Sequence, residues 1–102
     1  MLRYHAQVGT PRASRNLTRL CKHFRHKVSV DYDERRARIE FPFGRCRMEA
    51  TPDSQRIDCA AEPGPADARL RFVLEDHLLR FSGEEALRID WRDGPLGEEG
   101  GA

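Results

Sequence analysis

The sequence predicts a single α+β domain, a two-layer sandwich in which both helices cover one face of an antiparallel-dominated sheet. Two stretches repeat apolar residues at helical spacing, several short stretches alternate apolar and polar residues, and turn-forming residues separate them. The elements follow the order β-α-β-β-β-β-α-β without an internal repeat or a linker. We therefore expect one domain over residues 1–92, followed by a disordered, acidic, glycine-rich tail over 93–102.

The first strand and helix are expected over residues 3–8 and from Thr10 to about residue 25. Thr10 fits a helix N-cap, because its hydroxyl can accept an otherwise unbonded backbone N–H, and Pro11 fits the first helical position. The apolar stripe of this helix is Ala13, Leu17, Leu20, Cys21 and Phe24.

Four strands should follow, over residues 28–32, 36–41, 45–50 and 55–61. One face of their sheet becomes apolar when the pairs are Val30 with Ile39, Phe41 with Cys46, and Ala50 with Gln55. The same registers align Asp31, Arg38, Glu49 and Arg56 on the other face, with Glu40, Arg47 and Asp58 beside them. Opposite charges would then meet at every step, which argues against a nucleic-acid surface on this face.

The second helix should begin at Pro65 and end before Gly83. Its stripe is Leu70, Val73, Leu74, His77, Leu78 and Phe81. The segment from Leu87 to Trp91 alternates apolar and charged residues and predicts a final strand.

Composition indicates the class of protein and its cellular location. Its 102 residues are 34% charged and 8% aromatic, which is compatible with a folded domain. No apolar run approaches the roughly 18 residues needed to span a membrane. The N-terminus lacks the apolar region of a signal peptide, so we expect a cytoplasmic protein whose three cysteines are reduced thiols.

Charge is concentrated at the N-terminus. The net charge is +1, yet residues 1–30 contain seven Lys or Arg and no Asp or Glu. A candidate binding surface on the first helix consists of Arg15, Arg19, Lys22, His23, His26 and Lys27. It suits an acidic protein or an anionic small molecule. The alternative is an ordinary solvated helix face. The sequence is also compatible with a homodimer.

A second candidate is a zinc or iron site. Cys46 and Cys59 are expected neighbours across two strands, near the end of the first helix, and thiolate with imidazole suits these metals. The candidate ligands are Cys46, Cys59, His23, His26 and His77. No CxxC spacing supports the site, and the alternative is that the cysteines are small core residues. We therefore predict no cofactor as the leading expectation.

No enzyme class is indicated. The sequence contains no nucleophile-elbow, P-loop, Rossmann or HExxH pattern. The interpretation leans toward a protein without catalytic activity.

Three stretches resemble the bacterial domain-of-unknown-function family 2218: TPRASRNLTRLCKHFRHKV, RIEFPFGRCRMEA, and DHLLRF with LRIDW. The resemblance covers residues 6–92 and implies a small accessory domain, because some family members occur beside siderophore-interacting flavin reductases. Asn16 departs from the pattern, in which an aromatic residue is expected. The matching positions are Leu20, Cys21, His23, Phe24, His26, Lys27, Phe41, Pro42, Gly44, Cys46, His77 and Phe81.

The leading hypothesis is therefore a non-catalytic binding or accessory protein linked to iron–siderophore handling, with His23 and His26 at its contact surface. A metal-binding protein or metalloenzyme that uses Cys46, Cys59 and a histidine is the alternative. We expect neither a nucleic-acid nor a membrane partner.

Overall fold

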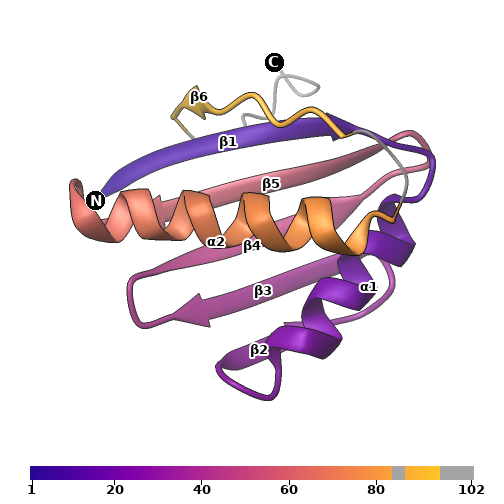
Figure 1. Cartoon of the computed structure of the whole chain (residues 1–102), viewed down its shortest axis with the longest axis horizontal. Helices are drawn as coiled ribbons and strands as arrows, with labels where there is room; N and C mark the ends of the chain where they lie inside the picture. The colour runs from indigo at the N-terminus through magenta and orange to yellow at the C-terminus, as the bar shows by residue number, and fades with distance from the viewer. Residues whose placement is uncertain (84–86, 95–102) are drawn as a thin grey trace.

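The computed structural model describes residues 1–83 and 87–94. The chain forms β1 (Leu2–Gly9), α1 (Ala13–Phe24), β2 (Ser29–Tyr32), β3 (Arg36–Phe41), β4 (Gly44–Ala50), β5 (Ser54–Ala61), α2 (Pro65–Phe81) and β6 (Arg92–Asp93). The six strands make one sheet in the order β2-β3-β4-β5-β1-β6, and every neighbouring pair is antiparallel. Both helices lie on the same face of this sheet (Figure 1). The predicted fold class is confirmed.

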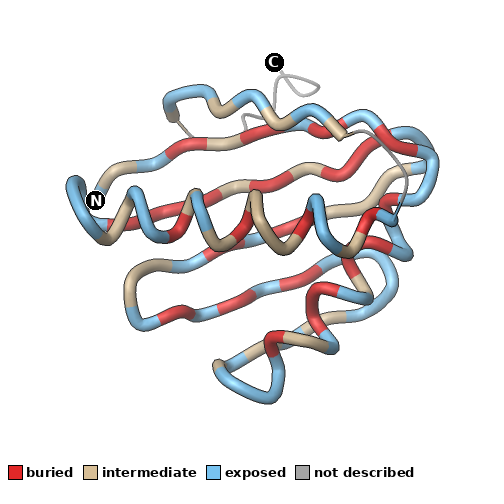
Figure 2. Tube along the Cα trace, in the orientation of Figure 1, coloured by how far each residue is buried: buried red, intermediate tan, exposed pale blue. Residues whose placement is uncertain are grey.

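The core lies between this face and the two helices. Along β3, buried and exposed residues alternate without exception, because successive side chains of a strand point to opposite faces (Figure 2). Ile39 of β3 and Ile57 of β5 are buried on the covered side, and Leu17, Leu20 and Leu74 of the helices pack over the same layer. Burial of these apolar side chains is the main stabilising term of the fold.

Helix α1 begins at Ala13, two residues later than the sequence predicts with Pro11 at the first helical position. Arg12 precedes its first turn and makes no capping bond through its side chain. The hydroxyl of Thr10 instead accepts a hydrogen bond from the Arg12 backbone N–H at 3.0 Å. Thr10 thus shapes the turn that leads into the helix, because a threonine hydroxyl can bond a backbone group two residues on.

The predicted register between β3 and β4 was wrong by two residues. Phe41 pairs with Gly44, and Ile39 rather than Phe41 pairs with Cys46, because the hairpin turn contains only Pro42 and Phe43. The other two predicted registers, around Val30–Ile39 and Ala50–Gln55, are confirmed. A shift of two residues leaves every side chain on its predicted face, since the strand period is two.

Gly44 is required by space rather than by an unusual backbone conformation. A Cβ atom there would lie 2.9 Å from the Ala60 carbonyl oxygen and 3.0 Å from both the Ala61 Cβ and a Leu70 methyl carbon. The β4 backbone therefore approaches β5 and α2 more closely than any side chain allows.

The last strand also differs from the prediction. Only Arg92–Asp93 pairs with β1, and the segment 87–91 forms no strand. Its alternation remains visible, because Leu87, Ile89 and Trp91 pack against the core. Trp91 meets the Tyr4 ring edge-on, with the ring centroids 5.2 Å apart. Of the predicted disordered tail, Asp93 lies in β6 and residues 95–102 lie outside the described residues.

Candidate functional site

The LCKHFRHK stretch, residues 20–27, covers the end of helix α1 and the turn after it, and its residues face two different surroundings. Leu20, Cys21 and Phe24 are buried against the sheet, whereas Lys22 and His26 are exposed. The helical wheel predicts this division, because positions three and four residues apart share a face.

His23 lies at the boundary, where α1 meets α2. Its ring centroid is 4.9 Å from that of His77 and 5.3 Å from that of Phe81, both on α2. The His77 ring also packs on Phe24, at 4.9 Å. We call these four residues, His23, Phe24, His77 and Phe81, the histidine seam. The two helices bring together two imidazoles that are 54 residues apart in the sequence.

A row of aromatic rings continues the seam along the hairpin between β3 and β4. Phe24 meets Phe41 edge-on at 5.1 Å, and Phe41 stacks on Phe43 at the same centroid distance. The guanidinium of Arg69 lies over the Phe43 ring at 5.1 Å. The seam is therefore one end of an aromatic row that ends at a cation on α2.

A hydrogen bond defines which ring nitrogen of His77 carries the proton. His77 Nδ1 lies 2.8 Å from the backbone oxygen of Val73. Since a carbonyl oxygen only accepts, Nδ1 carries the proton, and in the neutral ring the lone pair is on Nε2. The Nε2 atom of His23 is shielded from solvent and has no hydrogen-bond partner within the described part of the chain.

Four basic side chains act on His23. Burial lowers the pKa of its imidazole, and His77, Lys27, Arg80 and His26 lower it further, because each of them disfavours a positive charge on His23. At neutral pH His23 is therefore an uncharged imidazole, in contact with aromatic rings and near Lys27 and Arg80.

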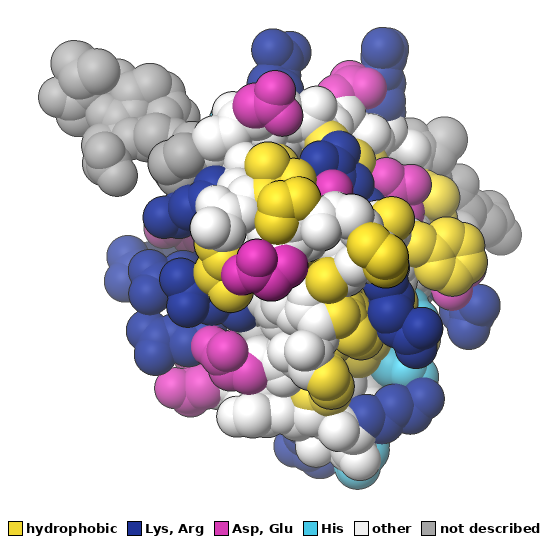
Figure 3. All heavy atoms as spheres, turned by 90° about the vertical axis from the view of Figure 1, so that its left-hand side faces the viewer, with side chains coloured by type: hydrophobic (Ala, Val, Ile, Leu, Met, Phe, Trp, Pro, Cys, Tyr) yellow, Lys and Arg dark blue, Asp and Glu magenta, His cyan; other side chains and the backbone are white. Residues whose placement is uncertain are grey.

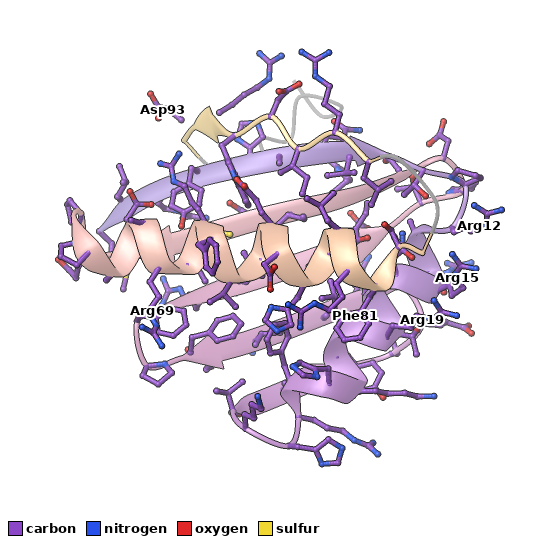
Figure 4. The ribbon with its side chains drawn as sticks, viewed as in Figure 1. Arg12, Arg15, Arg19, Arg69, Phe81 and Asp93 are labelled. Atoms are coloured by element: carbon purple, nitrogen blue, oxygen red, sulfur yellow. The ribbon has the colours of Figure 1, made fainter. Side chains whose placement is uncertain are left out.

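Two residues of the predicted binding surface take a structural role. Arg15 donates to the backbone oxygen of Ser82 at 3.4 Å, and Arg19 donates to that of Phe81 at 3.2 Å. Figure 4 shows both arginines at the end of α2, opposite the end that carries Arg69. Cations at these carbonyls complement the negative end of the helix dipole. Lys22, His26 and Lys27 remain exposed beside the seam.

The cysteines form a layer of their own. Cys46 and Cys59 are paired across β4 and β5, as predicted, and all three cysteines are buried, reduced thiols. The pKa of Cys46 is raised mainly by its hydrogen bond with Cys59 and by burial, with a smaller contribution from nearby Cys21. Burial raises the pKa of Cys21 to about 12. The Cys21 and Cys46 thiols are therefore neutral at physiological pH.

Within the described residues, no histidine is grouped with this layer as a set of metal ligands. Among residues 1–83 and 87–94, no three His, Cys, Asp or Glu side chains are grouped so that they could hold a metal ion. The expected approach of His23, His26 or His77 to the Cys46–Cys59 pair is not seen.

Sequence reasoning singled out His23 and His77 separately but not their contact. A usable signal existed: two helices predicted to cover one face must pack side by side, and both histidines lie on or beside the apolar stripes. It also missed Arg80, which stands near His23, and the complete burial of Asn16.

Comparisons with known proteins agree with this fold. Residues 5–92 match the model of a family described as uncharacterized proteins conserved in bacteria, DUF2218. The chain belongs to this family. It is also similar to PA4090 from Pseudomonas aeruginosa, whose NMR structure matches at 34% identity and a TM-score of 0.75, over 90% of this chain and 96% of that one.

No curated protein matches the chain. Within the described residues, no helix is both long and apolar enough to cross a membrane.

Proposed function

We propose that this protein is a non-catalytic binding protein whose ligand is an anionic aromatic small molecule, held at the histidine seam. The observation that carries the proposal is the shielded, unpartnered Nε2 of His23, which lies against Phe24, His77 and Phe81. A buried polar atom without a partner is costly, and a ligand that bonds to it removes the cost.

The surroundings of His23 define the chemistry of the ligand. Aromatic rings in the seam offer edge and face contacts to another ring. Lys27, which lies near His23, would attract negative charge, and Arg80 also lies near His23, where it is paired with Asp76 at 2.9 Å. A ring that bears phenolate or carboxylate oxygens satisfies both features.

Ferric siderophore chelates with aromatic donor groups belong to this class. The resemblance of the sequence to its family implies an accessory role beside siderophore-interacting flavin reductases, and the proposed ligand agrees with that role. The protein partner would then be such a reductase. We include a cytoplasmic location in the proposal, and fractionation of cells that produce the tagged protein tests it.

Isothermal titration tests the ligand class. A ferric catecholate chelate, a ferric hydroxamate chelate without aromatic rings, and metal-free 2,3-dihydroxybenzoate are titrated into the wild-type protein. We expect the two aromatic ligands to bind and the hydroxamate chelate to bind at least tenfold more weakly. Equal binding of all three ligands, or binding of none of them, would refute the proposal.

Variants locate the site. His23→Phe keeps the ring packing but removes the nitrogen, and Lys27→Gln removes one cation, so each should weaken binding about tenfold. Arg25→Gln is the matched control, since Arg25 is exposed directly after α1 and is not among the groups that act on His23. Equal weakening in the control would indicate general attraction to a basic protein.

The metal-binding alternative remains a separate proposal. Elemental analysis of protein purified without chelator measures zinc and iron directly. Stoichiometric metal that is lost in Cys46→Ala and Cys59→Ala would favour it over the seam proposal, and metal-free protein would refute it.

A further inference from the structure

The sheet face turned away from the helices carries six arginines, contributed by four strands: Arg3, Arg36, Arg38, Arg45, Arg47 and Arg56. Figure 3 shows Lys and Arg side chains gathered on one flank of the molecule. Three of the six are ion-paired. Arg3 contacts Asp58 at 3.2 Å, and Glu49 receives both Arg36 at 3.7 Å and Arg56 at 3.3 Å.

The other three, Arg38, Arg45 and Arg47, are exposed and form no ion pair with another described residue. We call them the arginine triad. The register places Arg38 directly opposite Arg47, and Arg45 lies two residues along the same strand as Arg47. Like charges directly opposite each other across two strands are destabilising, so this arrangement contributes nothing to the fold.

The neighbouring carboxylates do not neutralise the triad by contact. Asp31 is the cross-strand partner of Arg38, and Glu40 is that of Arg45, yet neither is ion-paired within residues 1–83 and 87–94. Asp58 is opposite Arg47, but its ion pair is with Arg3. Three guanidinium groups are therefore left with free donors on one small area.

We propose that the arginine triad is a binding site for one compact oxyanion, a phosphoryl group. Directly opposed Cβ atoms are about 5 Å apart, and positions two apart on a strand are about 7 Å apart. Long arginine side chains can converge over that span. A guanidinium donates two parallel hydrogen bonds to phosphate oxygens, and three of them match the charge and the acceptors of a phosphate dianion.

The surroundings favour a compact anion over an extended one. Glu40 lies beside the triad itself, opposite Arg45 and two residues from Arg38, and it leaves this group as a whole a compact cation. Asp31 lies on the β2 side and Asp58 on the β5 side, so a long polyanion would meet negative charge on both sides. The outward positions of β1 to β5 contain no Phe, Tyr or Trp on which nucleic-acid bases could stack. The site is on the opposite face from the histidine seam and does not depend on it.

An NMR titration tests the triad. Inorganic phosphate and a phosphomonoester, glycerol 3-phosphate, are added to 15N-labelled protein against sodium chloride at constant ionic strength. We expect saturable shifts of β3 and β4 amides with both, and about tenfold weaker binding in Arg38→Gln and Arg47→Gln. Arg35→Gln is the charge-matched control, an exposed arginine in the β2–β3 turn, and it should bind like the wild type.

Two outcomes would overturn the proposal. Identical, non-saturating shifts in the wild type and all three variants would mean a general salt effect. Affinity that rises steadily with the length of a polyphosphate or an oligonucleotide would mean an extended polyanion surface. The amide spectra of the variants show directly that each is folded, and His23→Phe should leave phosphate binding unchanged.

Discussion

The two faces of the one sheet follow opposite rules. On the covered face, Ile39, Cys46 and Cys59 form a cross-strand row in which every neighbour is apolar. On the open face, the neighbouring row runs from Asp31 through Arg38 and Arg47 to Asp58, with two like charges at its centre. Packing of the core explains the first row. The two like charges at the centre of the second row do not stabilise the fold, and for this reason we assign these arginines a binding role.

The comparison also explains why the β3–β4 register was predicted wrongly. A two-residue shift exchanges one apolar pair for another on the covered face, so burial cannot distinguish the two registers. Each charge pair on the open face contributes only about 0.2–1 kcal/mol. Charge complementarity is therefore too weak to outweigh a short hairpin turn and the close packing at Gly44.

The largest expected effect tests the contrast between the faces at two adjacent residues of β3. Ile39→Ala should lower the free energy of unfolding by about 2–5 kcal/mol, because it leaves a cavity in the core. Arg38→Ala should change it by no more than about 0.5 kcal/mol, because the side chain is exposed and unpaired. Urea unfolding of both variants measures this. A loss above 1 kcal/mol in Arg38→Ala would show that the arginine has a structural role.

The next test concerns the register. Gly44→Ala should destabilise the protein by about 1–3 kcal/mol, since the added methyl group would overlap Ala60 and Leu70. Gly9→Ala is the control, because a Cβ at Gly9 meets no atom within 4 Å. Thermal unfolding compares the two. Equal melting temperatures would mean that the close approach at Gly44 is relieved at little cost.

Asn16 is the exception on the covered side of the sheet, because it is a polar side chain among buried apolar ones. It is fully buried on α1, and neither polar atom of its side chain has a hydrogen-bond partner among the described residues. Asn16→Leu should therefore raise the free energy of unfolding by about 1 kcal/mol. Urea unfolding measures the change. A destabilised variant would imply that the amide is satisfied by bound water.

The smallest expected effect is the pH dependence due to His23. Folding lowers its pKa, mainly through burial, so the unfolded state binds the proton more readily. Its contribution to stability is complete above the unfolded pKa of about 6.5 and is lost as the pH falls through the folded value. Urea unfolding between pH 7.5 and 5 should show a shallower loss in His23→Phe than in the wild type. Arg25→Gln, which changes an exposed side chain that is not among the groups acting on His23, should keep the wild-type slope.

Much of the candidate site was visible in the sequence, but only as separate residues. The helical wheel placed Leu20, Cys21 and Phe24 inside and left His23 at the boundary. It could not show that His77 lies opposite His23, because the distance between two helices depends on the sheet beneath both. The cysteine pair was predicted correctly, whereas His23 and His77, which were expected to join it, pack against aromatic rings, and His26 is exposed.

The sequence by itself determined the order of the elements, the face on which each side chain lies, and the division of α1 into buried and exposed residues. These follow from the 2.0 and 3.6 residue periods, which are local properties of the chain. Only the tertiary structure decided the β3–β4 partners, the short β6 and the meeting of His23 with His77. These depend on turn geometry, on close backbone approach and on the packing of distant segments, none of which leaves a periodic trace in the sequence.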